Sequence, residues 1–324
     1  MTDRYAVIGN PIAHSKSPMI HAAFATQTGE LIEYGRILGD PNDFAGDVRR
    51  FVAEGGRGLN VTVPFKTAAF ELLDDLSARA HAAGAVNTLI VRDGGLLRGD
   101  NTDGIGLLRD LTDNHGLALA GKRVLLLGAG GAARGVVQPL LEARPAELLI
   151  ANRTASKAEA LAALGHDHAV SARNQRWTCE TKPDAIAALT PGSHADVRPQ
   201  ASPKPNRDQD QDQDQRAERP TRVSGCGLDA LQGRRFDLII NATSTGLDGQ
   251  VPSIPDDCLA EGGWVYDLLY ADAPTPFCRW GQARGAARVL DGLGMLVEQA
   301  AESFWLWRGI RPETAPVITQ LRNP

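Results

Sequence analysis

The chain has 324 residues, of which 43% are hydrophobic and 23% are charged, and its formal net charge is -5. This length predicts two domains of about 150 residues, each able to bury its own core. The charge is acidic and no segment approaches the roughly 20 apolar residues of a spanning helix, so we expect neither nucleic acid nor a membrane as a partner.

The first hundred residues alternate short apolar runs with helical patterns. Strands are predicted at residues 5–8, 33–38 and 58–63, and helices at residues 18–28, 43–54 and 66–73, with Asp43 as the cap of the second helix. Residues 87–91 and 96–98 flank Asp93-Gly94-Gly95, which indicates a β-hairpin. This alternation is typical of an α/β domain with a mostly parallel sheet.

A strand, a glycine turn and a helix follow a connecting helix predicted at residues 103–114. The apolar run at residues 123–127 leads into Gly128-Ala129-Gly130-Gly131-Ala132-Ala133, a helix at residues 132–142 and a strand at residues 147–151. This order matches the dinucleotide fingerprint, in which glycines make the turn and the pyrophosphate binds at the N-terminus of the helix. We therefore predict a Rossmann-like second domain, and the alternative is a tight turn without a ligand.

The type of dinucleotide is indicated at the end of the next strand. An acidic residue there would bind the ribose hydroxyl of NAD, but this chain has Asn152-Arg153-Thr154, with Lys157 behind. Because the planar guanidinium of arginine suits a 2′-phosphate, we predict NADP. The alternative is that Arg153 is a solvated arginine at the start of a helix.

A polar stretch interrupts the second domain. Pro, Gln, Asp and Arg dominate it, and few apolar residues are present to offset the entropy of ordering. We therefore expect a disordered surface insertion at about residues 169–222. His166, His168 and His194 lie in or near it, but without paired cysteines we expect no metal site.

Regular elements resume after this stretch. Strands are predicted at residues 237–241 and 264–268, a long amphipathic helix at residues 292–308 and a last helix from about residue 312. The four cysteines are scattered, and the N-terminus lacks the basic region and apolar run of a signal peptide. We therefore expect reduced thiols and a cytoplasmic protein.

Polar side chains stand at the ends of several predicted strands of the first domain. Ser15 and Ser17 follow the first strand, Lys66 follows the third, and Asn87 and Asp103 lie on either side of the hairpin. Taken singly, such residues are as typical of turns and helix caps as of a site. Together they suit a polyhydroxylated acid, because each substrate hydroxyl needs donors and acceptors held in place.

These motifs, in this order, resemble the shikimate dehydrogenase family, which reduces 3-dehydroshikimate with NADPH in aromatic amino-acid biosynthesis. The resemblance covers nearly the whole chain except the polar insertion. The segments that carry it are Gly9-Asn10-Pro11, Ser15-Lys16-Ser17-Pro18, Asn60-Val61-Thr62-Val63-Pro64-Phe65-Lys66, Gly84-Ala85-Val86-Asn87-Thr88, Gly99-Asp100-Asn101-Thr102-Asp103-Gly104, Gly128 to Ala132, Asn152-Arg153-Thr154, Asn241-Ala242-Thr243-Ser244, Tyr266-Asp267 with Tyr270, and Asp291-Gly292-Leu293-Gly294-Met295-Leu296.

The resemblance implies a substrate-binding domain at residues 1–105 and 293–324 and a Rossmann-like NADP-binding domain at residues 106–292. It implies that Ser15 and Ser17, with Tyr270, bind the substrate carboxylate. The residues implied around the ring hydroxyls are Thr62, Lys66, Asn87, Asp103 and Gln299. The residues implied to hold NADP are Gly128, Ala129, Gly130, Gly131, Ala132, Asn152, Arg153, Thr154, Ala155, Ser156 and Lys157, with the backbone of Leu268 and Gly292 near the nicotinamide.

Hydride transfer makes or consumes an alkoxide, so a proton must move with it. The resemblance assigns this proton to Lys66, with Asp103 beside it. Because an opposite charge favours the ammonium form, we expect Asp103 to orient Lys66 and the substrate hydroxyl rather than to activate the amine.

Ala78 departs from the family pattern, since many relatives carry an acidic residue there, linked to the cofactor side of the cleft.

Two alternative functions stay open. The first is a quinate/shikimate dehydrogenase of the same fold that accepts NAD, against which Asn152-Arg153-Thr154 argues. The second is a catalytically silent NADPH-binding sensor, against which Lys66 and Asp103 argue. The sequence does not decide whether the chain forms a homodimer.

Overall fold

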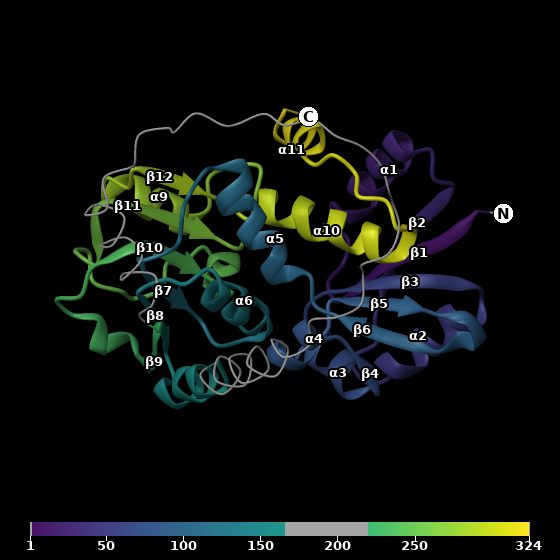
Figure 1. The fold of residues 1–324 in the computed structure, drawn as a ribbon, viewed down its shortest axis with the longest axis horizontal. Helices are drawn as coiled ribbons and strands as arrows, with labels where there is room; N and C mark the ends of the chain where they lie inside the picture. The colour runs from purple at the N-terminus through teal and green to yellow at the C-terminus, as the bar shows by residue number, and fades with distance from the viewer. Residues whose placement is uncertain (1, 166–219, 324) are drawn as a thin grey trace, which may run out of the picture.

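The computed structural model describes residues 2–165 and 220–323. Their strands form two six-stranded sheets, and these occupy opposite halves of the molecule with helices around them (Figure 1). The predicted architecture of two α/β domains is confirmed. The insertion predicted at about residues 169–222 lies, up to residue 219, outside the described residues.

The first sheet has the strand order β2-β1-β3-β5-β6-β4. It is mostly parallel, as predicted, because β5 alone runs antiparallel to its two neighbours, β3 and β6. Its strands are β1 (Asp3–Gly9), β2 (Ile32–Leu38), β3 (Gly56–Val61), β4 (Asp75–Leu76), β5 (Thr88–Val91) and β6 (Leu97–Asp100). Its helices are α1 (Ser17–Thr28), α2 (Phe44–Ala53), α3 (Lys66–Glu71) and α4 (Ala78–Ala83).

Local signals account for most of these elements. Asp43 caps α2 as predicted, and its carboxylate accepts from the Gly46 amide at 3.0 Å. Strand β3 ends at Val61, two residues earlier than predicted, because the chain turns there and the Phe65 amide donates to the Thr62 carbonyl at 2.9 Å. The sequence predicts neither β4 nor α4, since both are too short to show a periodic pattern.

The second sheet has the order β12-β11-β10-β7-β8-β9, and all of its pairs are parallel. This is the doubly wound order of dinucleotide-binding domains, in which ligands bind where the strand order reverses, here between β7 and β10. The strands are β7 (Arg123–Leu127), β8 (Glu147–Asn152), β9 (Arg222–Gly227), β10 (Phe236–Asn241), β11 (Leu259–Asp267) and β12 (Arg288–Leu290). The helices include α6 (Gly131–Glu142) and α9 (Pro276–Ala283).

Strand β9 corrects the end of the insertion. The sequence assigns residue 222 to the polar insertion, and this is wrong, because Arg222 begins β9 and pairs with Glu147 of β8. The pairing continues to Asn152 and Gly227, so β8 supplies the hydrogen-bond partners that keep this weakly apolar strand in the sheet. A helix over residues 155–165, which the sequence analysis also missed, follows β8.

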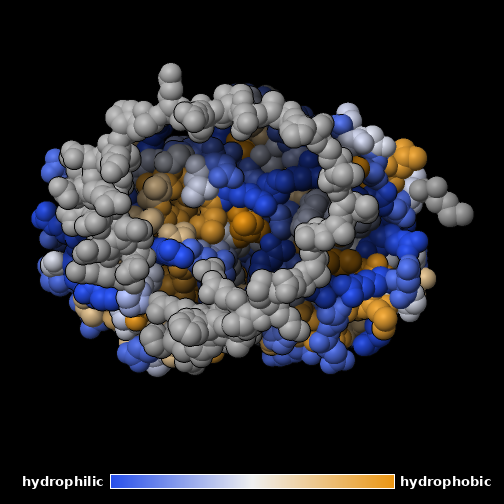
Figure 2. Space-filling view, viewed as in Figure 1, coloured by the Kyte–Doolittle hydropathy of each residue, from blue (hydrophilic) through white to orange (hydrophobic). Residues whose placement is uncertain are grey.

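Three helices join the two halves or cover their junction: α5 (Asp103–Arg109), which continues as a π-helical turn to Asn114, α10 (Leu293–Arg308) and α11 (Ala315–Arg322). Helix α10 crosses the middle of the molecule (Figure 1) and packs against both α5 and α1. Phe304 and Val297 of α10 share an apolar core with Phe24 of α1. Figure 2, drawn from the same side, shows hydrophobic residues gathered near the middle of this face, over α5 and α6, among hydrophilic ones.

His21 is a buried histidine between α1, β2 and α10. Its ring stacks on Tyr34 with the centroids 4.1 Å apart and lies close to Phe24 and Phe304. This burial lowers the pKa of His21 from 6.5 to about 3, because the surroundings disfavour the imidazolium. At pH values between about 3 and 6.5, His21 binds a proton in the unfolded chain but not in the folded chain. The free energy of unfolding therefore falls as the pH falls from 6.5 towards 3.

We expect the free energy of unfolding to decrease by up to about 1.4 kcal/mol per pH unit below pH 6.5 because of His21. Urea unfolding between pH 7 and pH 5 measures this slope, and the variant His21→Phe is expected to flatten it. His14→Gln is the control for replacing a histidine, because His14 is exposed whereas His21 is buried. An equal slope in wild type and His21→Phe would contradict the assignment.

Candidate active site

Lys66 and Asp103 each stand at the start of a helix, Lys66 as the first residue of α3 and Asp103 as the first residue of α5. Both helices begin at the same edge of the first sheet, where Asn87 precedes β5. The Lys66 Nζ donates a hydrogen bond to Asp103 Oδ2, and the Asn87 amide donates to Asp103 Oδ1 at 2.8 Å. The two charged side chains are only 15% and 7% exposed, so the pair is largely shielded from water.

Gln299 joins this group from α10, far along the chain. Its side-chain oxygen accepts from the Thr102 hydroxyl at 3.2 Å and from the Asn87 amide at 3.3 Å. The close approach of α5 and α10 depends on Gly106, where an added Cβ would lie 2.7 Å from Gln299 Cβ. The structure therefore brings together four predicted residues, Lys66, Asn87, Asp103 and Gln299, and adds Thr102. Thr102 lies inside the motif Gly99 to Gly104, so the motif could have identified it as a residue of the site.

Ser15 lies on the loop that leads from β1 into α1, and Ser17 is the first residue of α1. We call this segment, residues 10–17, the serine loop. Ser17 is buried, and its amide donates to the Ser15 hydroxyl at 3.3 Å, while Arg36 donates to the Ser15 carbonyl at 2.6 Å. Thr62 lies against the start of this loop, since a Cβ added at Gly9 would meet Thr62 Cγ2 at 2.4 Å. These contacts hold the Ser15 backbone against Arg36 of β2 and place Thr62, which follows β3, against the end of β1.

Tyr270 reaches the same loop from the segment that follows β11. The Lys16 Nζ lies 6.0 Å from the centre of the Tyr270 ring and 3.1 Å from Asp272 Oδ1. Burial raises the pKa of Tyr270, so that its hydroxyl stays protonated and can donate at neutral pH. Tyr270 therefore lies next to the serine loop, although the second sheet carries it.

The glycine turn after β7 leaves open space in front of the N-terminus of α6, where an anion can bind. Gly128 has φ +108°, and an added Cβ would lie 3.0 Å from the Ala242 carbonyl oxygen, so only glycine fits there. Gly130 precedes α6, no side chain caps this helix, and a Cβ added at Gly130 would meet nothing within 4 Å. Free N–H groups at a helix N-terminus with open space before them fit a dinucleotide pyrophosphate.

The segment after β8 presents polar groups outward. The Asn152 amide donates to the Thr154 carbonyl at 3.0 Å and forms a small turn. Arg153, Ser156 and Lys157 are exposed around this turn, and Ala155 is partly buried. The exposed guanidinium and ammonium at the end of β8 fit a phosphate next to the adenosine of a dinucleotide.

The two halves meet where the glycine turn reaches Lys66. A Cβ added at Gly131 would lie 3.8 Å from Lys66 Cβ, and one added at Gly135 would lie 3.1 Å from Asp103 Oδ2. On the second sheet, Leu268 and Gly292 also touch, since a Cβ added at Gly292 would lie 2.2 Å from the Leu268 carbonyl oxygen. An amine that can give a proton therefore stands beside a turn that can hold a dinucleotide.

Residues 7–89 match the family model of the shikimate dehydrogenase substrate binding domain, residues 110–178 that of shikimate / quinate 5-dehydrogenase, and residues 292–322 that of the shikimate 5′-dehydrogenase C-terminal domain. Over 322 residues the chain is 50% identical to the shikimate dehydrogenase (NADP(+)) of Halorhodospira halophila, with 99% of each chain covered. The chain belongs to the shikimate dehydrogenase family. The resemblance inferred from its motifs is confirmed.

The same family relationship extends to solved structures. The shikimate 5-dehydrogenase of Thermus thermophilus, solved in complex with NADP(H) and shikimate, is 30% identical and superimposes with a TM-score of 0.74 over 99% of both chains. The shikimate dehydrogenase (NADP(+)) of Alkalilimnicola ehrlichii, like that of Halorhodospira, is 50% identical over 99% of the chain. Proteins named shikimate dehydrogenase therefore match the chain over nearly its whole length, in sequence and in fold.

Ala78, at the position where the resemblance implies an acidic residue in many relatives, is the exposed first residue of α4. The methyl group of Ala78 cannot form a hydrogen bond, but the next residue, Arg79, forms three. Arg79 donates to both oxygens of Asp100, at 3.0 and 2.9 Å, and to Glu302 at 2.8 Å. In this shikimate dehydrogenase family member, Arg79 thus ties α4 to the segment that leads into Asp103.

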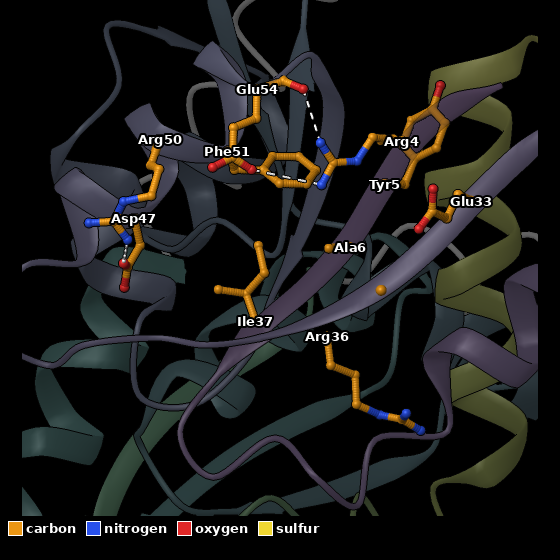
Figure 3. A pocket seen from close by; sticks show the side chains of 11 residues that line it. Arg4, Tyr5, Ala6, Glu33, Arg36, Ile37, Asp47, Arg50, Phe51 and Glu54 are labelled. Atoms are coloured by element: carbon orange, nitrogen blue, oxygen red, sulfur yellow. Dashed lines mark hydrogen bonds and ion pairs between the residues drawn. The ribbon is translucent and has the colours of Figure 1, made fainter. Parts of the chain in front are cut away.

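A pocket of about 220 Å³ lies away from this site, between β1, β2 and α2 (Figure 3). Four of its charged residues form two ion pairs: Arg4 lies 3.8 Å from the Glu54 carboxylate, and Arg50 lies 2.9 Å from that of Asp47. None of the predicted site residues lines it. We assign the chemistry to the junction of the two halves and not to this pocket.

The described residues hold neither a cluster of metal-ligating side chains nor a membrane-spanning helix. Within residues 2–165 and 220–323, no cluster of three or more His, Cys, Asp or Glu side chains has the arrangement of a metal site. In the same ranges no helix has the length and hydropathy needed to span a bilayer. His166, His168 and His194 lie outside the described residues.

Proposed function

We propose that the chain catalyses the reversible, NADPH-dependent reduction of 3-dehydroshikimate to shikimate. The single observation that carries this proposal is the approach of the glycine turn to Lys66, where a Cβ added at Gly131 would lie 3.8 Å from Lys66 Cβ, with the Lys66–Asp103 pair beside it. Relatives at 50% identity are named shikimate dehydrogenase (NADP(+)), and the Thermus structure holds both NADP(H) and shikimate.

The proposed substrate site lies at the edge of the first sheet. Ser15, Ser17 and Tyr270 supply hydroxyls for the substrate carboxylate, and the contacts around the serine loop support this role. Thr62, Asn87 and Gln299 would hold the ring hydroxyls together with Lys66 and Asp103. The cluster around Asn87 supports this, because its amides and hydroxyls are already fixed by one another.

The proposed NADP site combines the glycine turn with the end of β8. The backbone of Gly128, Ala129, Gly130, Gly131 and Ala132 would hold the pyrophosphate, and Asn152, Arg153, Thr154, Ala155, Ser156 and Lys157 would hold the adenosine side. Leu268 and Gly292 would lie beside the nicotinamide. NADP supplies the hydride of the reaction when it is bound.

The proton that accompanies the hydride is handled by Lys66. In reduction, the Lys66 ammonium donates a proton to the ketone oxygen as negative charge develops on it, and in oxidation the resulting amine takes the proton of the alcohol. Asp103 accepts hydrogen bonds from Lys66 and Asn87 on its two oxygens, so its carboxylate is fixed. The fixed carboxylate of Asp103 would orient the Lys66 ammonium toward the substrate, and its negative charge balances the positive charge of the ammonium.

We assign residues 1–105 and 293–324 to the substrate domain and residues 106–292 to the NADP domain. The packing of α10 on α1 supports this division.

We also propose a cytoplasmic location, since Cys226, Cys258 and Cys278 are free thiols. A homodimer through edge strand β2 is part of the proposal, since Leu31 just before the strand and Leu38 at its end are exposed. Sedimentation equilibrium tests the dimer against the monomer mass of 34.6 kDa.

The activity is tested with the purified full chain and four pairs of reactants, shikimate or quinate with NADP or NAD. The rate of each reaction is measured from the absorbance of the reduced cofactor that it forms. We expect the largest kcat/KM for shikimate with NADP. Faster turnover of quinate with NAD would favour the quinate/shikimate dehydrogenase. NADPH binding without turnover of any pair would favour the silent sensor and contradict the proposal.

A further inference from the structure

Arg79 of α4 connects two buried carboxylates that lie far apart in the sequence. Its Nε and Nη2 donate to the two oxygens of Asp100, at 3.0 and 2.9 Å, and its Nη1 donates to Glu302 Oε1 at 2.8 Å. Asp100 is the last residue of β6, Glu302 lies on α10, and both are buried. The planar guanidinium therefore holds the end of β6 against α10 with three charge-assisted hydrogen bonds.

The Asp100 carboxylate also holds the turn that leads from β6 into α5. Its Oδ1 accepts from the Ser77 hydroxyl at 2.7 Å and from the Asn101 amide at 2.6 Å. The side-chain oxygen of Asn101 in turn accepts from the Asp103 amide at 3.1 Å. A continuous series of hydrogen bonds therefore runs from the Arg79 guanidinium through Asp100 and Asn101 to the backbone of Asp103.

The Asp103 side chain has little room to follow a movement of this turn. A Cβ added at Gly135 of α6 would lie 3.0 Å from Asn101 Oδ1 and 3.1 Å from Asp103 Oδ2. The same Asp103 Oδ2 accepts the hydrogen bond from Lys66. A shift of the turn would therefore either separate the Asp103 carboxylate from the Lys66 ammonium or press it against α6.

The two carboxylates differ in how much they depend on Arg79. Glu302 Oε2 also accepts from Arg109 at 2.6 Å and from Arg311 at 3.3 Å. In the part of the chain that the structure describes, Arg79 alone forms an ion pair with Asp100. Removing Arg79 therefore leaves Glu302 with two guanidinium partners and leaves the Asp100 carboxylate without a described counter-charge.

We propose that Arg79 is a positioning residue for the proton transfer, an inference that rests on the proposed function. Through Asp100 it holds the turn at residues 100–103, and this turn sets the place of the carboxylate of Asp103 that orients Lys66. An unpaired buried carboxylate is costly, so without Arg79 the Asp100 side chain turns toward water and releases the Asn101 amide. Arg79 acts only through this series of contacts and touches no reacting atom.

The test is the variant Arg79→Gln, which keeps a polar side chain and removes the charge and the planar fork. Because a displacement of about 1 Å in a catalytic group can cost about 10²-fold in rate, we expect kcat for shikimate with NADP to fall roughly 10- to 100-fold. The KM for shikimate is expected to change less than kcat, since the loss concerns the alignment of Lys66 in the transition state. Urea unfolding checks that each variant is folded under the conditions of the assay.

The matched control is Arg109→Gln. Arg109 is also a partly buried arginine that donates to Glu302, but its ion pair does not include Asp100. Its replacement is expected to leave kcat unchanged. An equal loss of kcat in Arg109→Gln and Arg79→Gln would indicate a general defect in the packing around Glu302 and would overturn the role of Arg79.

A double-mutant cycle with Asp100→Asn tests whether Arg79 acts through Asp100. We expect Asp100→Asn to lower kcat by a factor similar to that of Arg79→Gln. The double variant is expected to be no slower than the slower single variant, because both changes break the same pair. Effects that multiply in the double variant would contradict the proposal. If Arg79→Gln does not fold, Asp100→Asn decides alone: a fall in kcat supports the proposal, and a wild-type kcat overturns it.

The activity of the wild type separates this inference from the proposed function. If wild type oxidises shikimate and Arg79→Gln keeps the wild-type kcat, the role of Arg79 is wrong and the proposed function stands. If wild type oxidises no shikimate at all, the proposed function is overturned and the role of Arg79 with it.

Discussion

Replacing Lys66 with alanine is expected to lower kcat for shikimate oxidation by roughly 10²- to 10⁴-fold, the usual contribution of a positioned acid–base group. Lys66 provides the amine at the point where the first sheet meets the glycine turn, and Asp103 already holds it. Because the amine acts mainly on the developing alkoxide, the KM for shikimate is expected to change little. Steady-state rates with shikimate and NADP measure both constants.

Lys122→Ala is the matched control, since Lys122 is an exposed lysine just before β7. Its removal is expected to leave both constants unchanged. If Lys66→Ala raised KM and kept kcat, Lys66 would be a binding residue and some other group would have to move the proton.

Replacing Arg153 with aspartate is expected to shift cofactor preference strongly. Arg153 is exposed at the end of β8, where it can bind a 2′-phosphate, and an aspartate there would repel the phosphate and accept from the ribose hydroxyl of NAD. The loss of a charge-assisted contact together with the added repulsion predicts that the ratio of kcat/KM for NADP to that for NAD falls by roughly 10²-fold.

The control for this change of charge is Arg288→Asp, at an exposed position on β12, the opposite edge strand of the second sheet. This variant is expected to keep the wild-type ratio. An unchanged ratio in Arg153→Asp would refute the role of Arg153 and reopen the choice of cofactor.

The fold was largely predictable because its main elements carry local signals. The strand–turn–helix unit from β7 to β8 follows from five consecutive apolar or basic residues, a glycine triplet and a helical run, all within one segment. Strand β9 was not predictable in the same way, because its sequence Arg-Val-Ser-Gly-Cys-Gly has little alternation. Its place depends on hydrogen bonds to β8, which no local pattern records.

The site shows the same division. Lys66, Asn87 and Asp103 could be selected because each lies in a motif at the end of a predicted strand. The buried contact of Ser303 with Asn60 could not, since it joins α10 to β3, which are far apart in the sequence. Hydrogen-bond partners at such separation are set by the packed fold and not by any pattern in the residues near them.

The central claim is that the Lys66 amine and the nicotinamide meet at the same carbon of a bound shikimate. A crystal structure of the chain with NADP and shikimate tests this most directly. The account predicts that Lys66 Nζ lies within about 3 Å of the hydroxyl on the carbon that is oxidised, the distance that proton transfer requires. A structure in which both ligands are bound and Lys66 points away from that hydroxyl would contradict it.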